Sequence, residues 1–69
     1  MKNYAKNLAR NIKKLRQKND ITLKELSAKT GINESFLLKI EQAKAKRIFL
    51  SHINSFCECF NIGIKELFE

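Results

Sequence analysis

The sequence predicts an all-α fold, a compact bundle of five helices. The chain has 69 residues with no proline and only two glycines, a composition that favours a helical bundle and argues against disorder. Apolar residues also recur at helical spacing along most of the chain. We expect one domain over residues 1–69, with a core too small to surround a buried catalytic cleft. The expected helices cover residues 3–18, 22–30, 33–42, 50–60 and 64–68.

The first helix is predicted by an apolar stripe at helical spacing. Leu8, Ile12 and Leu15 lie on one face, and Tyr4 or Ala5 extends it. Basic side chains occupy the other faces of this helix. After the stripe ends, Asn19-Asp20 forms a turn and Ile21 is expected to pack beneath the next helix.

The second and third helices carry the clearest local signals. Thr22 with Glu25 fits the capping box, in which each side chain satisfies a free backbone N–H of the other residue. Gly31 can adopt the left-handed conformation that ends a helix, and Asn33 is a favourable N-cap for the next one. Two helices joined by a short turn that contains glycine form the helix-turn-helix signature, whose second helix can enter the DNA major groove.

The remaining helices are predicted by their apolar faces and their ends. Ser51 is a candidate N-cap for the fourth helix, and Asn61 is a plausible C-cap. The last helix is short and follows Gly63. The apolar residues expected to face inward are Phe36, Leu37 and Ile40 in the third helix, and Ile53, Phe56, Cys57 and Phe60 in the fourth.

Charge is distributed unevenly along this basic chain. The net charge is +7; residues 1–47 hold thirteen Lys or Arg against four acidic residues, and residues 48–69 hold one Lys against three. One part of the molecule should therefore attract an anionic partner such as double-stranded DNA. A membrane surface is the other partner that such a charge implies, but it needs a free apolar face, and here the apolar faces are required for the core.

Neither a membrane segment nor a secretory signal is recognisable. No stretch approaches the 18 or more consecutive apolar residues of a membrane span. The basic start of the chain lacks the apolar run of a secretory signal, so we expect a cytoplasmic protein.

Taken in order, these motifs resemble the Cro/CI-type (XRE-like) helix-turn-helix family of phage repressors and bacterial transcriptional regulators. The resemblance implies a five-helix fold of the lambda-repressor type that binds operator DNA as a homodimer. It is carried by Ile12-Lys13-Lys14-Leu15-Arg16, Thr22, Leu26, Ser27-Ala28-Lys29-Thr30-Gly31, Ile32-Asn33-Glu34-Ser35-Phe36-Leu37, Lys39-Ile40-Glu41, Asn61-Ile62 and Lys65-Glu66-Leu67-Phe68.

The resemblance also implies roles for particular side chains. Arg16 and Glu41 take the positions of a structural ion pair that fixes how two helices dock. The positions that contact base edges are Glu34, Ser35, Leu38 and Lys39. The positions that contact the DNA backbone are Thr22, Asn33, Gln42, Lys44, Lys46 and Arg47. Apolar residues available for a dimer interface, some of them also needed for the core, are Ile62, Ile64, Leu67 and Phe68.

The proposed base contacts follow from hydrogen-bonding chemistry. Lys39 can donate to guanine O6 and N7, Glu34 can accept from cytosine N4, and Ser35 can serve either base. Leu38 can contact a thymine methyl group. The alternative for the polar residues is an ordinary solvated helix face.

Three residues depart from the family pattern. Leu23 stands where a glutamine commonly binds a phosphate, and Ala43 stands where a glycine usually follows the third helix. Ala43 is therefore expected to lengthen that helix or alter its exit. Phe49 replaces the usual Ser or Thr N-cap of the fourth helix, which should cost about 1 kcal/mol. Phe49 and Leu50 form either an exposed apolar spot that binds something or, in the case of Phe49, part of the core.

The cysteines and the single histidine give no sign of a metal site. Cys57 and Cys59 are two residues apart on a helix, so they face different sides, and His52 has no ligand-like spacing to either. We expect Cys57 to be buried and Cys59 to be half-exposed; a disulfide through Cys59 across a dimer is the alternative. No nucleophile motif, phosphate-binding loop or ligand cluster is present, so we expect no enzyme activity, cofactor, metal or small-molecule substrate.

Two functions remain open from the sequence. The first is a sequence-specific double-stranded DNA-binding transcriptional regulator, a repressor or autoregulator, that inserts the helix 33–42 into the major groove as a homodimer. The second is an antitoxin-like or other protein-interaction module that keeps the fold and binds a protein partner. The absence of glutamine at Leu23 and the acidic Glu34 are the best support for the second.

Overall fold

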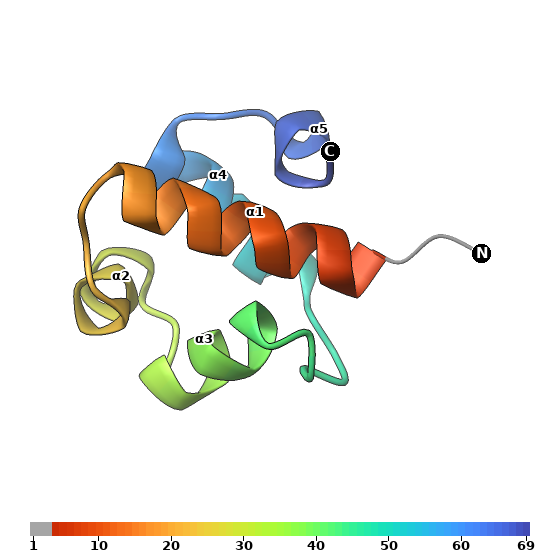
Figure 1. Ribbon diagram of the computed structural model, residues 1–69, viewed down its shortest axis with the longest axis horizontal. Helices are drawn as coiled ribbons and strands as arrows, with labels where there is room; N and C mark the ends of the chain where they lie inside the picture. Colours follow the sequence, from red (N-terminus) through yellow and green to blue (C-terminus); the bar gives the residue numbers. More distant parts are fainter. Residues whose placement is uncertain (1–3) are drawn as a thin grey trace.

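A computed structural model describes residues 4–69, and over that range the chain forms five helices and no strand (Figure 1). The all-α prediction is therefore confirmed. Asn3, the first residue of the predicted helix 3–18, lies outside the described residues. The helices are α1 (Tyr4–Lys18), α2 (Leu23–Thr30), α3 (Glu34–Glu41), α4 (Leu50–Phe60) and α5 (Ile64–Leu67).

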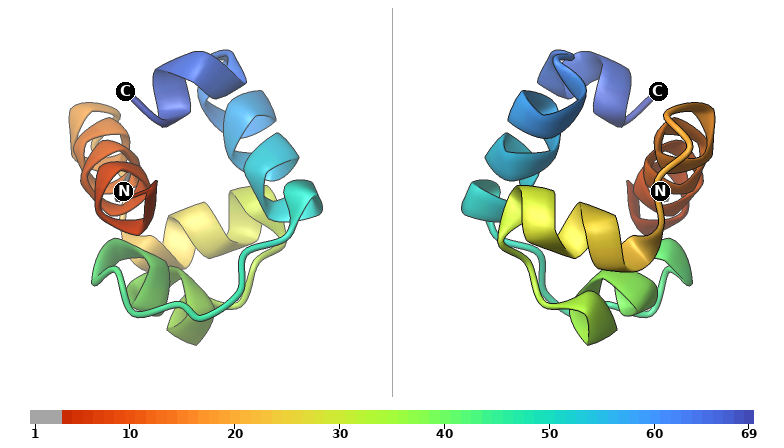
Figure 2. Two further views of the ribbon diagram at one scale, coloured as in Figure 1. Left: turned by 90° about the vertical axis from the view of Figure 1, so that its right-hand side faces the viewer. Right: turned by 90° about the vertical axis from the view of Figure 1, so that its left-hand side faces the viewer.

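The helices form a closed ring around one core. α1 packs mainly on α3 and α5, α4 packs on α2 and α5, and α2 packs on α3. Figure 2 shows α1 and α4 on opposite sides, with α2 and α3 at one end and α5 at the other. The two helices of the helix-turn-helix therefore lie together at one end of the molecule, away from α5.

Every helix contributes to the core. Phe56 is the largest of the fully buried side chains. Of the predicted stripe on α1, Leu8 and Ile12 are buried and Leu15 packs against them, but Tyr4 remains 58% exposed and does not extend the stripe into the core. The buried cluster consists of Leu8, Ile12, Leu26, Ile32, Leu37, Ile40, Ile53, Phe56 and Leu67.

Within residues 4–69, α1, α2, α3 and α4 are each followed, within two residues of the last helical one, by a residue with a left-handed backbone. Those residues are Asp20 (φ 56°), Gly31 (φ 77°), Ala43 (φ 59°) and Asn61 (φ 54°). The predicted helix ends at Gly31 and Asn61 are confirmed. Only one of the four positions is a glycine, so the other helices end by the same geometry at a greater conformational cost.

The N-cap of α4 differs from the candidate Ser51, although the helix spans the predicted residues 50–60. Ser51 does not cap this helix, because α4 begins at Leu50 and its N-cap residue is Phe49. Phe49 has no side-chain cap hydrogen bond, as expected for an aromatic residue at this position. Its backbone N–H donates instead to Nδ1 of His52 over 3.2 Å, so the histidine satisfies one of the free donors at the helix start.

Ala43 ends α3 and does not lengthen it. The Ala43 N–H donates to the Ile40 carbonyl (3.0 Å), and the Lys44 N–H donates to the Lys39 carbonyl (2.8 Å). This pair of bonds is the Schellman motif, which requires the left-handed conformation that glycine adopts most readily. The expectation of a longer helix is therefore wrong, because the motif forms with alanine in the place of glycine.

Replacing Ala43 with glycine is expected to stabilise the fold by about 0.5–1 kcal/mol. A left-handed L-residue costs roughly 1–2 kcal/mol, and glycine relieves this strain. The larger conformational entropy of glycine in the unfolded chain offsets part of the stabilisation. Thermal unfolding should show the midpoint rising by a few degrees. The matched control is Ala28→Gly, in the exposed interior of α2, where the same change should destabilise by about 1 kcal/mol. A midpoint that falls in both variants would contradict the account of strain at Ala43.

None of the helices in residues 4–69 has the length and apolar character needed to cross a membrane.

Candidate nucleic-acid interface

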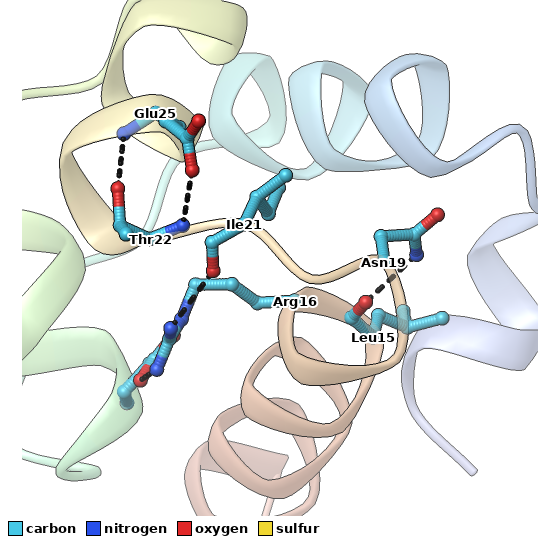
Figure 3. A network of polar contacts seen from close by, with 7 residues as sticks. Leu15, Arg16, Asn19, Ile21, Thr22 and Glu25 are labelled. Carbon is cyan, nitrogen blue, oxygen red and sulfur yellow. Dashed lines mark hydrogen bonds and ion pairs between the residues drawn. The ribbon is translucent and has the colours of Figure 1, made fainter.

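Both ends of α2, the helix before the turn, are fixed by local hydrogen bonds. The Glu25 N–H donates to Thr22 Oγ1 (3.1 Å) and the Thr22 N–H donates to Glu25 Oε1 (2.7 Å), so the predicted capping box is present (Figure 3). At the other end of α2, the Gly31 N–H donates to the Ser27 carbonyl (2.8 Å). Because each end of α2 is capped, the turn leaves α2 in a defined direction.

The start of α3 is capped by Asn33, as predicted. Asn33 Oδ1 accepts from the Ser35 N–H (2.8 Å) and the Phe36 N–H (3.4 Å). Residues 33–42 were predicted as helix; the regular helix runs over Glu34–Glu41, with Asn33 as its N-cap and Gln42 as its C-cap. The helix therefore spans two turns, with its N-terminal end fixed by the Asn33 side chain.

Arg16 and Glu41 form a two-pronged ion pair between α1 and α3. Arg16 Nε donates to Glu41 Oε2 (2.7 Å) and Nη2 donates to Oε1 (3.0 Å). The side chains are only 16% and 5% exposed, and Nη1 also donates to the Ile21 carbonyl (3.1 Å; Figure 3). The hydrogen bond to Glu41 raises the pKa of Arg16 above its ordinary value. One guanidinium therefore connects the end of α1, the segment before α2 and the end of α3.

The outer face of α3 is formed by four exposed residues. They are the positions for which the resemblance implies base contacts, namely Glu34, Ser35, Leu38 and Lys39. Leu38 is 44% exposed although it is apolar, while its neighbour Leu37 is fully buried. The inward residues thus anchor α3 to the core and leave the outer face available to a partner.

A basic groove runs beside this face, between α3, the segment 42–49 and the start of α4. Its volume is about 1100 Å³. The basic side chains that line it are Lys39, Lys44, Lys46 and Arg47, and its wall contains no acidic residue. Asn33 and Gln42 line it too. All but one of the positions for which the resemblance implies DNA-backbone contacts therefore lie along it; the exception is Thr22, at the start of α2.

Comparison with known protein families identifies the family to which this chain belongs. A model of the Cro/C1-type HTH DNA-binding domain matches residues 11–69. The chain belongs to the Cro/C1-type family. Neither curated proteins nor solved structures give a significant match to it. The suspected family resemblance is therefore confirmed, and in this Cro/C1-type domain α2, the turn at Gly31 and α3 form the helix-turn-helix.

Leu23 has a structural role in this Cro/C1-type domain. Its side chain is half-buried and packs against the core cluster. The position at which family members commonly carry a phosphate-binding glutamine therefore contributes apolar contact to the core instead.

The C-terminal residues assigned to a dimer interface divide between the surface and the core. Ile64 is 50% exposed, and Ile62 and Phe68 are half-buried. Leu67 is fully buried, so its assignment to an interface is corrected: the side chain is already surrounded by its own core. A side chain with no exposed surface adds no area to a subunit contact.

An apolar groove of about 710 Å³ lies beside Ile64 and Phe68. Tyr4 forms its opposite wall and meets Phe68 edge-on, with ring centroids 6.3 Å apart. This groove was not predictable from the sequence, because it combines the start of α1, the segment before α4, and α5. Ala45 and Lys46 line both this apolar groove and the basic groove.

Cys57 and Cys59 are free thiols and both are partly buried. The expectation of a buried Cys57 is therefore corrected. Burial raises the pKa of both thiols; Glu66 raises that of Cys57 further, and Lys29 partly opposes the effect at Cys59. Raised pKa values leave less thiolate at neutral pH and make both groups poor nucleophiles. Among residues 4–69, no three His, Cys, Asp or Glu side chains are grouped to hold a metal ion.

Proposed function

We propose that this Cro/C1-type domain is a sequence-specific, double-stranded DNA-binding transcriptional regulator. It acts in the cytoplasm as a repressor or autoregulator and inserts α3 into the major groove. The observation that carries this proposal is the exposed polar face of α3 beside a groove lined by four cationic residues and no acidic one. A face with hydrogen-bonding groups reads base edges, and flanking cations hold the phosphates.

Each part of this surface has a separate role. Glu34, Ser35, Leu38 and Lys39 contact base edges. Thr22 and Asn33 stand at the N-termini of α2 and α3, where free N–H groups and the helix dipole favour a phosphate. Gln42, Lys44, Lys46 and Arg47 continue the phosphate contacts along the basic groove.

The regulator acts as a homodimer through its C-terminal face. Residues 48–69 carry three acidic residues against one lysine, so two copies repel each other far less there than over the rest of the chain. The exposed Ile64 and Tyr4 and the half-buried Phe68 supply apolar surface around the apolar groove. The domain measures 33 × 23 × 20 Å, a size that lets two copies side by side place their α3 helices about 34 Å apart, in successive major grooves.

Replacing Lys46 with alanine is expected to weaken binding to all DNA sequences alike. Lys46 is exposed and lines the basic groove, so it contributes a phosphate contact that carries no sequence information. The slope of log affinity against log salt should become flatter by about 0.9 for each subunit, hence by about 1.8 for the proposed homodimer, because each subunit loses one phosphate contact. Titration of labelled DNA at several salt concentrations measures both effects. An unchanged slope would show that Lys46 does not contact a phosphate.

Selection of bound fragments from a random double-stranded DNA pool tests the proposal as a whole. The expected result is one enriched motif, arranged as a two-fold repeat with half-sites one helical turn apart. Recovery of unenriched DNA at every salt concentration would reject sequence-specific regulation. An enriched motif without a repeat would reject the homodimer but would still support the base contacts.

A protein-interaction module, of the antitoxin type or another, is the second candidate. Two observations favour it: Leu23 packs on the core in place of a phosphate-binding glutamine, and the apolar groove beside α5 is open to a partner. Co-purification of a second polypeptide from the native host, together with an absence of salt-sensitive DNA binding, would favour this function over the first.

A further inference from the structure

An exposed aromatic side chain lies inside the basic groove. Phe49 is 54% exposed, and its ring centroid lies 5.6 Å from that of His52. His52 in turn lies 5.0 Å from Phe36 of α3. All three rings line the basic groove, so a row of aromatic side chains crosses it from α3 to the first turn of α4.

This row is anchored at one end and open at the other. Phe36 packs against the core cluster, and Nδ1 of His52 accepts the Phe49 N–H over 3.2 Å. The hydrogen bond and the ring contacts hold Phe49 at the surface in a defined position. An apolar ring held in this way is a preorganised contact, because little of its freedom remains to be lost on binding.

The stability of the fold does not explain a phenylalanine at this position. Phe49 is the N-cap residue of α4, where Ser, Thr, Asp or Asn would accept a backbone hydrogen bond and phenylalanine makes none. Its ring remains more than half exposed, so it contributes little to the core. A partner that covers the ring would account for the residue.

The charges around Phe49 identify the chemistry of that partner. Lys39, Lys44, Lys46 and Arg47 line the same groove and no acidic side chain does. The partner must therefore carry repeated negative charge together with apolar carbon between the charges. A DNA strand has both, since each pair of phosphates is separated by a deoxyribose.

We propose that Phe49 packs against the deoxyribose carbons of the DNA strand whose phosphates bind the basic groove. This contact rests on the proposed DNA-binding function and adds to it an apolar, sequence-independent component. Phe49 lines the groove between α3 and α4, and of the four outer-face residues only Lys39 shares that groove. The other cations beside Phe49 are Lys44, Lys46 and Arg47, all proposed to contact phosphates. It therefore meets the backbone and not the base edges.

The decisive variant is Phe49→Ser, which removes the ring and supplies a hydroxyl that can cap α4. Its melting temperature should equal or exceed that of the wild type, while its DNA affinity should fall roughly five- to tenfold, as expected when the exposed half of a phenylalanine is no longer covered. Because no charge is lost, the salt slope should stay unchanged. The ratio of affinities for selected and scrambled DNA should also be unchanged.

The matched control is Leu50→Ser. Leu50 is the next residue, is 66% exposed and does not line the basic groove, so its replacement should leave DNA affinity unaltered. Phe49→Leu keeps an apolar side chain in the groove and should retain most of the affinity. Sedimentation of each variant should give the wild-type oligomeric state.

Each alternative outcome overturns the contact in a recognisable way. Wild-type affinity in Phe49→Ser, or an equal loss in Leu50→Ser, would show that the ring does not touch DNA. A changed oligomeric state in Phe49→Ser would assign the ring to a second copy of the chain. If the wild-type chain showed no salt-sensitive DNA binding, both the proposed function and this contact would be rejected. If the wild type bound DNA and Phe49→Ser bound it equally well, only the contact would be rejected.

Discussion

Replacing Arg16 with alanine is expected to lower the free energy of unfolding by about 3–5 kcal/mol. The change leaves the Glu41 carboxylate, only 5% exposed, without its two guanidinium hydrogen bonds, and it also removes the donor to the Ile21 carbonyl. Small domains are stable by about 5–15 kcal/mol, so this loss is a large part of the total. Urea unfolding followed by circular dichroism measures it.

Two further variants distinguish the effect of losing the ion pair from the effect of losing a positive charge. Lys13→Ala removes the same charge from an exposed position on α1 and should change stability by less than about 0.5 kcal/mol. The double variant Arg16→Met with Glu41→Leu replaces both ions with apolar side chains and should recover most of the loss. An unfolding midpoint unchanged by Arg16→Ala would show that the pair contributes nothing to stability.

Replacing Lys39 with alanine is expected to relax the preference for one or two base pairs, at about 1–3 kcal/mol each. Lys39 is exposed on the outer face of α3, where its ammonium group can donate to guanine O6 and N7. Affinity for the selected DNA should fall about five- to 150-fold for each base pair affected, while affinity for unrelated DNA should change little. Binding to a set of sites with single base-pair changes locates the affected positions.

Lys14→Ala is the charge-matched control for Lys39. Lys14 is exposed on α1 and lines a separate hollow with Ile62 and Glu66, remote from the outer face of α3. Its removal should weaken binding slightly and equally for all sequences through long-range attraction alone. If Lys39→Ala retains the full sequence preference of the wild type, then α3 does not read DNA through this side chain.

Local sequence signals predicted the helix-turn-helix closely. Thr22 with Glu25, Gly31 and Asn33 act through hydrogen bonds and backbone conformations within four residues, so their effect does not depend on the rest of the fold. The apolar spacing of Leu37 and Ile40 likewise predicted which face of α3 is buried and, by exclusion, which face is exposed.

Features that depend on distant segments were not predictable in this way. Ala43 adopts a left-handed conformation that its identity disfavours, because the Schellman bonds at the end of α3 require it. Leu67 is buried only because the ring of helices closes over it, and spacing within a four-residue helix does not reveal that. The capping role of His52 follows from its place three residues after Phe49, but nothing in the sequence showed that its ring would join Phe36.

The candidate interface also combines features that local sequence predicts with features that depend on the folded chain. Exposure of the outer face of α3 follows from periodicity, whereas the basic groove exists only because the segment 42–49 returns beside α3 on its way to α4. The sequence shows Lys44, Lys46 and Arg47 as a basic segment. Their alignment with Lys39 is a property of the folded chain.

Ala45 and Lys46 line both the basic groove and the apolar groove, so the two grooves share this short stretch of backbone. If dimerisation at the apolar groove holds this stretch in the conformation that binds phosphates, dimerisation and DNA binding strengthen each other. Thermodynamic linkage then requires the two effects to be equal in size, so DNA would tighten the dimer by the same factor by which dimerisation tightens DNA.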